Sequence, residues 1–166
     1  MIFEIALGVL LAYIIYLRLT REVIIDADGS PYLIRYFLFK SRKFGRLLLH
    51  HIVRSDYDRA LHSHPWAFKS FILWGGYFEI ADSRQLETFQ EGWKRYRELQ
   101  RIKWWKPLSL LSNKDYWIHR IVLPKGKTAW TIVRNYPKSK EWGFWITPYD
   151  FCHHKNYSTK TGLCEV

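Results

Sequence analysis

The sequence predicts a mainly β protein, with one small antiparallel domain preceded by an apolar helix. Aromatic residues make up 18% of the chain and include nine tryptophans, a composition that suits the pleated, half-buried surface of a sheet. Short apolar runs alternate with glycine- and proline-containing turns, which is typical of antiparallel sandwiches and barrels. At 166 residues the chain can bury one core of ordinary size, so a single folded domain is expected.

The N-terminal segment IFEIALGVLLAYIIYL, residues 2–17, has Glu4 as its only charged side chain. Its length is close to the roughly 17 to 20 apolar residues that span a bilayer. No small-residue cleavage site follows it, so a removable signal peptide is not expected. Arg18 and Arg21 come next, and the positive-inside rule then keeps the domain in the cytoplasm. Two interpretations stay open, a membrane anchor and a first helix packed on a soluble cytoplasmic domain.

Turn residues divide the rest of the chain into strands. Asp28-Gly29-Ser30-Pro31 predicts a turn between two strands, and Gly75-Gly76 predicts a tight turn or bulge inside a hairpin. Residues 93–106 are ambiguous, because their apolar positions fit helical and strand spacing almost equally well. Strands are therefore expected before the first turn, in the hairpin 67–80, and over residues 32–39, 46–54, 115–123, 128–136 and 141–147.

These boundaries divide the chain into an apolar helix (1–20), a β domain (21–152) and a polar tail (153–166) that frays or packs loosely. The only cysteines, Cys152 and Cys164, do not form a disulfide framework and fit a reducing compartment. His153 and His154 lie beside them, but neither of the usual zinc-binding spacings is present, so a second metal site has little support.

A formal net charge of +11 predicts attraction to polyanions, either nucleic acid or an anionic membrane surface. The cations concentrate in residues 93–106, interleaved with tryptophan and tyrosine. Three interpretations fit this stretch: a solvated face whose tryptophans close the barrel, a face at the membrane interface, and a surface for single-stranded nucleic acid. Nucleic acid is the least favoured partner of the three.

The segment HSHPWAFKSFILWGG, residues 62–76, carries the most specific chemical signal. His62 and His64 are two residues apart, so in a strand both imidazoles point to one face. Such a pair supplies two of the three or more ligands that a transition metal needs. Without further context the pair is a weak signal, because isolated histidines usually serve packing or the surface.

The context resembles the first metal-binding motif of the cupin superfamily, written H-x-H, three or four residues, Glu, six residues, Gly. After His64, four residues lead to Lys69 at the glutamate position, and six more lead to Gly76. Pro65 also resembles the germin-type version of the motif. Lysine is cationic and does not normally bind a metal, so the resemblance implies a three-histidine centre, as in the cysteine dioxygenase branch, or a site that has lost its metal.

His119, in DYWIHRIVL, is the best match to the third histidine of the cupin second motif, although the flanking Gly and Pro are absent. Residues 25–150 also resemble a set of small cupin-like proteins of bacteria and their phages. The resemblance implies a small antiparallel β-barrel of the jelly-roll type. It also implies a divalent Fe, Mn, Ni or Zn ion with His62, His64 and His119 as ligands, and three tryptophans as cavity walls, Trp66, Trp130 and Trp142.

Other polar residues could surround this centre. Asp56 and Asp58 could accept imidazole N–H bonds, and one of His50 and His51, which face opposite sides of their strand, could reach the cavity. The alternative is that RSDYDR, residues 54–59, is a self-neutralising loop. Candidate residues for binding a substrate are Arg54, Arg59, Lys69 and Trp66.

The functional expectation is a metal-binding protein, and possible reactions are those of a metal-dependent oxygenase or isomerase acting on a small polar molecule. A second hypothesis is a non-catalytic ligand-binding or interaction module that has lost its metal, which Lys69 favours. A third and weaker hypothesis is a basic nucleic-acid binder.

Overall fold

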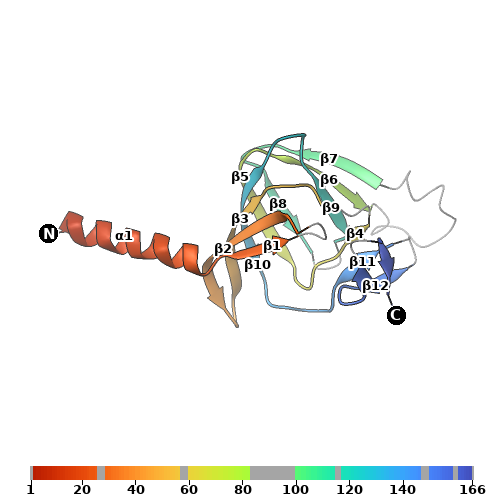
Figure 1. The fold of residues 1–166 in the computed structure, drawn as a ribbon, viewed down its shortest axis with the longest axis horizontal. Coiled ribbons are helices and arrows are strands. Elements are labelled where there is room, and N and C mark those ends of the chain that lie inside the picture. Colours follow the sequence, from red (N-terminus) through yellow and green to blue (C-terminus); the bar gives the residue numbers. More distant parts are fainter. Residues whose placement is uncertain are drawn as a thin grey trace.

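A computed structural model describes residues 2–25, 29–56, 60–82, 100–114, 117–146, 150–158 and 161–165. These residues form one helix, two six-stranded sheets and a small hairpin (Figure 1). Every strand pair is antiparallel, as the sequence predicts for a mainly β fold. The elements are α1 (Ile2–Leu19), β1 (Glu22–Ile25), β2 (Pro31–Ser41), β3 (Gly45–Ile52), β4 (Leu61–His62), β5 (Phe68–Trp74), β6 (Tyr77–Asp82), β7 (Gln100–Trp105), β8 (Leu110–Asn113), β9 (His119–Val122), β10 (Ala129–Asn135), β11 (Gly143–Trp145), β12 (Phe151–His153), β13 (Tyr157–Ser158) and β14 (Leu163–Cys164).

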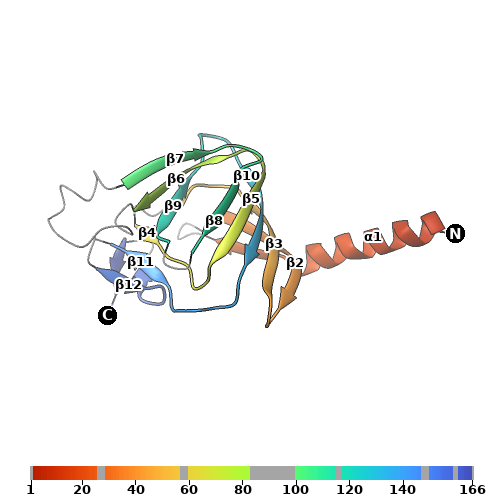
Figure 2. The same ribbon diagram turned by 180° about the vertical axis from the view of Figure 1, so that it is seen from behind.

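The first sheet has the order β1-β2-β3-β10-β5-β8, and the second has the order β12-β11-β4-β9-β6-β7. Neighbours such as β3 and β10 are far apart in sequence, which is the crossed connectivity expected of a jelly roll. Seen from behind, the two sheets curve around a common interior (Figure 2). The strands that carry the candidate metal ligands therefore face the inner surface of the first sheet.

Alternation along the strands of the first sheet builds the core. In β10 the buried residues Ala129, Thr131, Val133 and Asn135 alternate with half-buried ones, because successive side chains point to opposite faces. Thr131 and Asn135 make this inner face partly polar, although most buried residues of the interior are apolar. Three clusters hold the largest apolar contacts, and they are centred on Ile72, Leu48 and Leu61.

The turn between β5 and β6 depends on two glycines, as the sequence predicts. Gly75 and Gly76 have φ angles of 80° and 132°, a region that residues with a Cβ atom rarely adopt. A Cβ atom on Gly75 would also lie 2.1 Å from the carbonyl oxygen of Thr128. This close approach lets β5 join the first sheet while β6 joins the second.

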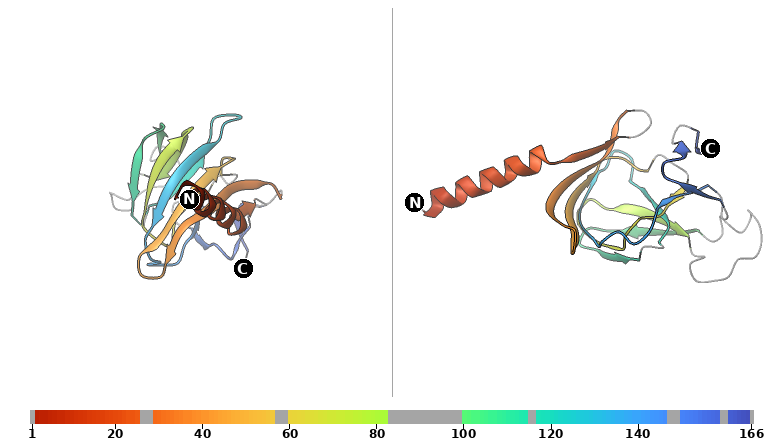
Figure 3. Two further views of the ribbon diagram at one scale, coloured as in Figure 1. Left: turned by 90° about the vertical axis from the view of Figure 1, so that its left-hand side faces the viewer. Right: turned by 90° about the horizontal axis from the view of Figure 1, so that it is seen from below.

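Helix α1 extends away from the β domain (Figures 1 and 3). None of its residues is buried, so it does not pack on the domain as one of the two interpretations supposed. Its closest tie is the Tyr13 hydroxyl, which donates to the Leu38 carbonyl at 3.3 Å. Among the described residues it is the one helix long and apolar enough to cross a membrane, with a mean hydropathy of 2.0.

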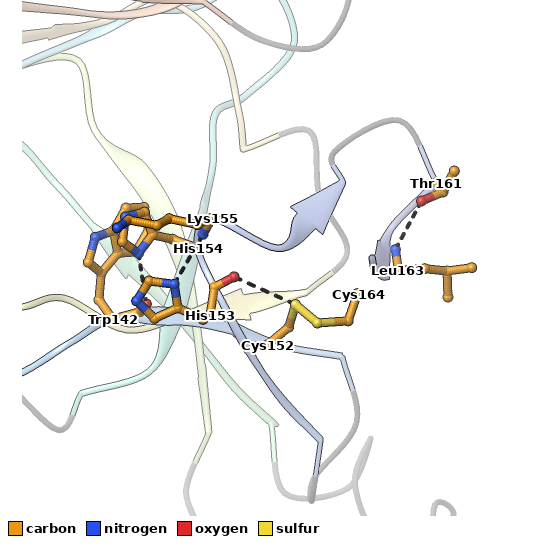
Figure 4. Close-up of a disulfide and its surroundings, with 8 residues drawn as sticks. All are labelled: Trp142, Cys152, His153, His154, Lys155, Thr161, Leu163 and Cys164. Atoms are coloured by element: carbon orange, nitrogen blue, oxygen red, sulfur yellow. Dashed lines mark hydrogen bonds between the residues drawn. A yellow bond between two sulfur atoms is a disulfide. The ribbon is translucent and has the colours of Figure 1, made fainter. Parts of the chain in front are cut away.

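The C-terminal region is more ordered than the sequence suggests. Cys152 and Cys164 form a disulfide, so the expectation of two reduced cysteines is wrong for this structure (Figure 4). Strands β13 and β14 pair as a hairpin, which brings Cys164 back to buried Cys152 on β12. The region expected to fray is thus folded against the second sheet.

Candidate metal centre

His62 and His119 come together because their strands pair. The short strand β4 lies between β11 and β9, and His62 is the direct cross-strand partner of His119. Opposite residues on neighbouring strands share a face, and the two ring centroids are 5.1 Å apart. The strand register therefore places two predicted ligands side by side.

His64 completes the cluster from the segment that follows β4. Its Nε2 lies 2.8 Å from Nε2 of His119, and its ring is 5.0 Å from that of His62. One ligand atom from each of the three residues lies within 4.8 Å of the others. All three predicted ligands are thus brought to one point at the edge of the cavity.

Glu79, on β6, holds His119 in position. Its Oε1 accepts a hydrogen bond from His119 Nδ1 at 2.5 Å, which leaves Nε2 of His119 directed at the other histidines. The carboxylate also accepts bonds from the indole nitrogens of Trp105 at 2.8 Å and Trp117 at 3.0 Å. Burial raises the pKa of Glu79, but the bonds from His119 and the two tryptophans outweigh it and keep the pKa below its usual value.

His62 and His64 are held in their neutral, metal-binding form. Burial, assisted by neighbouring His119, lowers the pKa of His62 to about 3. Burial and the nearby His62 and His119 also lower the pKa of His64 well below its ordinary value. A transition metal binds unprotonated imidazole, so at neutral pH no proton needs to leave His62 or His64 before an ion binds.

The fourth ligand position of the cupin motif belongs to Phe68, and the assignment of Lys69 to it was wrong. Phe68 is buried, with its ring 4.9 Å from His64 and 5.9 Å from His119. Lys69 is the next residue of β5 and therefore lies on the outer, exposed face, opposite Arg134. The motif allows three or four residues before this position. The structure has three, with six residues from Phe68 to Gly75.

A cavity of about 90 Å³ lies between the two sheets beside the histidines. It is lined by all three of them, by Phe68 and by Trp66, the one predicted cavity tryptophan that reaches it. Residues from β2, β3 and β10 form the opposite wall, and His50 is the member of its pair that faces inward. The site is thus a small, partly open cavity with the candidate ligands on one wall.

Several predicted residues do not take the places expected of them. Trp130 stacks on His51 at 4.1 Å on the outer face of the first sheet, because its neighbour Thr131 points inward. Trp142 stacks on His154 at 4.5 Å near the C-terminus, also away from the cavity. Neither tryptophan is a cavity wall.

The segment after β3 has a mainly structural role. Asp56 reaches the cavity, but its Oδ2 is 3.8 Å from His62 Nδ1, too far for a hydrogen bond, and instead accepts one from the Ile121 amide at 2.6 Å. Arg54 bonds Ser30 and does not line the cavity. Asp58 and Arg59 lie outside the described residues, as do Trp93 and the other members of the basic stretch up to residue 99.

A second group of possible ligands consists of Glu141, His153 and His154. Its two histidines lie near the disulfide (Figure 4). Its atoms are already engaged: Glu141 pairs with Lys138 and with His153 Nε2, and His154 Nδ1 bonds the Trp142 carbonyl at 3.2 Å. Glu141 is also largely exposed. We therefore assign no metal to this group.

The donor set of the first cluster fits a transition metal. It offers three imidazoles and one carboxylate that orients a ring, which is the usual arrangement around Fe, Mn, Ni or Zn. Sequence reasoning missed two contributors, Glu79 and Arg35, which reach this region through strand register. A polar residue between apolar neighbours in a strand ordinarily faces solvent, so the local pattern gave no signal for either position.

Comparisons with known proteins agree with this architecture. No family model matches the chain, and no curated protein matches its sequence. Among solved structures, Fe(II)-HppE with the alternative substrate (S)-1-HPP has 14% identity and a TM-score of 0.51 over 70% of this chain and 56% of that one. A hydroxypropylphosphonic acid epoxidase structure from S. wedmorenis has 16% identity and a TM-score of 0.48, also over 70% and 56%.

A cupin-2 domain from Rhodospirillum rubrum has 14% identity and a TM-score of 0.50, over 72% of this chain and 71% of that one. The chain spans just over half the length of HppE and more of the length of the cupin-2 domain. At these identities the likeness shows a shared fold. The two antiparallel sheets, the paired histidine strands and these matches identify the chain as a protein of the cupin fold.

Proposed function

We propose that the chain binds a divalent transition metal through His62, His64 and His119 and uses it in a reaction of a small molecule. The observation that carries this proposal is the convergence of the three ligand atoms within 4.8 Å at the edge of a cavity. Nε2 of His64 and Nε2 of His119 lie 2.8 Å apart, and the ring of His62 is turned toward both residues. A shared metal ion explains this arrangement directly.

The supporting residues fit an open metal site. Glu79 is bonded to His119 alone among the three histidines, so it orients a ligand without occupying the centre. Phe68 fills the place of a fourth ligand with an apolar ring. A bound ion would supply a Lewis acid with coordination positions left for a substrate or water.

An oxygenase or isomerase acting on a small polar molecule is the reaction type we propose. The cavity limits the reactant to a small molecule, and apolar side chains beside the histidines would keep bulk water away. An HppE structure with Fe(II) shares this fold, which supports iron as the first metal to test. The alternative of a module without metal no longer rests on Lys69, which lies outside the site, but on Phe68, which supplies no ligand at the motif position either.

The test is metal analysis of the full-length chain, purified in a neutral detergent and supplied with Fe(II), Mn(II), Ni(II) or Zn(II). We expect one ion per chain for at least one of these metals. The double variant His62→Ala with His64→Ala should bind that ion at least about 100-fold more weakly, since only one of three ligands remains. His51→Ala is the matched control, because His51 faces the outer side of the sheet.

Circular dichroism of each variant without metal separates loss of the site from loss of the fold. Equal metal content in the wild type and the folded double variant would contradict the proposal. A wild type that retains none of the four metals after dialysis would also contradict it, and would favour the non-catalytic module instead.

A further inference from the structure

A polar row crosses the inner face of the first sheet opposite the metal centre. Arg35 on β2 is the register partner of His50 on β3, and His50 is the partner of Thr131 on β10. All three residues line the cavity that holds the histidine cluster. Three strands that are neighbours in the sheet therefore each place one polar residue side by side on its inner face.

The two levels next to the row in the same strands are apolar. One register level to either side, the corresponding inner positions are filled by apolar residues, which belong to or pack against the buried clusters. An arginine and a histidine between two apolar levels are costly to bury unless they serve a specific partner. The flanking levels are Leu33, Ile52 and Ala129 on one side and Phe37, Leu48 and Val133 on the other.

Two atoms of the row lack a partner. Arg35 Nε and His50 Nε2 are buried and make no hydrogen bond within the part of the chain that the structure describes. A buried donor or acceptor without a partner is unfavourable relative to a bonded one. Both belong to residues that line the cavity, so a molecule bound there could satisfy them.

The charge of the row favours an anion. Arg35 brings a guanidinium group, and among the described residues one of its terminal nitrogens is engaged, by the half-exposed carboxylate of Glu22 at 3.3 Å. His50 is neutral, because burial and the adjacent Arg35 lower its pKa to about 3. Asp56 is the carboxylate on the cavity wall, and its Oδ2 is bonded to the Ile121 amide.

We propose that Arg35 and His50 bind the oxyanion group of a small molecule, a carboxylate or a phosphate-like group. This inference rests on the proposed function, because the remainder of the molecule would lie toward His62, His64 and His119 across the same cavity. Arg35 donates through its guanidinium, whose planar geometry suits an oxyanion, and His50 adds a neutral hydrogen bond. The substrate class is thus a small organic anion.

The test measures binding of acetate and inorganic phosphate, which represent the two oxyanion types, by titration calorimetry. The full-length chain is used in neutral detergent, both metal-stripped and loaded with one equivalent of the metal that it retains. We expect at least one anion to bind the metal-stripped wild type. Arg35→Gln should weaken this binding at least about tenfold, the effect of losing a charge-assisted contact.

The matched control is Arg134→Gln, because Arg134 lies in the same sheet and, next to inward-facing Val133 and Asn135, on its outer face. Its affinity should stay within about twofold of the wild type, since it contacts no cavity group. Arg35→Lys is the second variant if Arg35→Gln does not fold. It keeps the charge and loses the Nε donor, and should bind more weakly than the wild type.

Failure of this inference and failure of the proposed function give different results. Anion binding that is unchanged in Arg35→Gln or Arg35→Lys, or absent from the wild type, overturns the role of Arg35 while leaving metal binding intact. His62→Ala with His64→Ala should lose the metal and keep the anion affinity of the metal-stripped wild type. Loss of anion binding in that folded variant would place the anion on the histidines and overturn the inference.

Discussion

Phe68 and Lys69 are adjacent in the sequence. Phe68, and not Lys69, lies beside the histidines, because successive residues of a strand face opposite sides of the sheet. Phe68 is 8% exposed and touches two of the three histidines, whereas Lys69 is in solvent on the opposite face of β5. A shift of one residue moves a side chain from the core face to the solvent face. The motif alone allows both positions, so only the pairing of β5 with β10 and β8 resolves which residue faces the site.

Phe68→Glu should therefore behave differently from Lys69→Glu. The first places a carboxylate beside the histidines, and we expect metal affinity to rise about tenfold while the metal-free chain loses about 3 kcal/mol of unfolding free energy. Lys69→Glu should change neither quantity by more than about 0.5 kcal/mol, since it alters an exposed position. Metal titration and urea unfolding, each with and without metal, measure both effects. Equal responses of the two variants would contradict the assignment.

Glu79 acts on the metal centre only through His119. Because it is the diagonal neighbour of His119 across the β6–β9 pair, its place depends on register and could not be found from sequence spacing. We expect Glu79→Gln to lower metal affinity by about 10- to 100-fold, the usual loss when a partner of a ligating histidine is removed. Competition with a chelator of known affinity gives the value.

Glu141→Gln is the control for this change. Glu141 also contacts a histidine, His153, but near the C-terminus and largely in solvent. Its replacement should leave metal affinity within about twofold of the wild type. A larger effect there would mean that the group near the disulfide, and not the cavity, holds the ion.

At the level of secondary structure, long strands were easier to predict than short ones. Strands β2, β3, β5, β6 and β10 match the expected ranges because their apolar alternation and glycine turns are local signals. Strand β4 has only two residues and carries no periodicity, yet its pairing with β9 and β11 creates the histidine pair. Strands β8, β12, β13 and β14 were missed for the same reason, since a strand of two to four residues shows no periodicity.

Helix α1 has a proposed role that does not involve the metal. We propose that it attaches the chain to a membrane, because its 18 residues are apolar except for a few, with Glu4 and Arg18 as the charged ones, and none is buried. The full chain should float with phosphatidylcholine vesicles in a density gradient. Leu7→Arg with Leu11→Arg should abolish flotation, since each arginine costs about 3 kcal/mol in the centre of a spanning helix.

The control is Ile102→Arg, an equally polar change at an exposed position of β7. It should float like the wild type. Flotation that persists in the double variant would show that another surface binds lipid, and absence of flotation in the wild type would remove the membrane proposal.

Considered as a whole, the molecule keeps several neutral histidines in its interior, and this makes stability depend on pH. The pKa values of His50 and His62 are about 3 in the folded state, below the ordinary 6.5 of the unfolded chain. The unfolded chain therefore binds more protons between these values, so stability is full above pH 6.5 and falls as the pH decreases toward 3. The direction is the same for His64.

Each of His50 and His62 should account for about 2 kcal/mol of lost unfolding free energy between pH 7.5 and pH 5 in the metal-free chain. Urea unfolding at the two pH values measures the total. His50→Gln should reduce the lost unfolding free energy by about 2 kcal/mol, since it removes one titrating group outside the metal cluster. A pH dependence that is the same in the variant and in the wild type would contradict the buried neutral state of His50.

The redox state of the two cysteines depends on the compartment in which the protein lies. Cys152 and Cys164 close a loop that ties the C-terminal hairpin to β12, and such bonds persist in oxidising spaces but are reduced by cytosolic thiols. Arg18 and Arg21, in contrast, favour a cytosolic domain if α1 spans a bilayer. The two features thus predict opposite topologies. If α1 spans a bilayer, the redox state of Cys152 and Cys164 in the living cell would report on which side the β domain and its candidate metal centre lie.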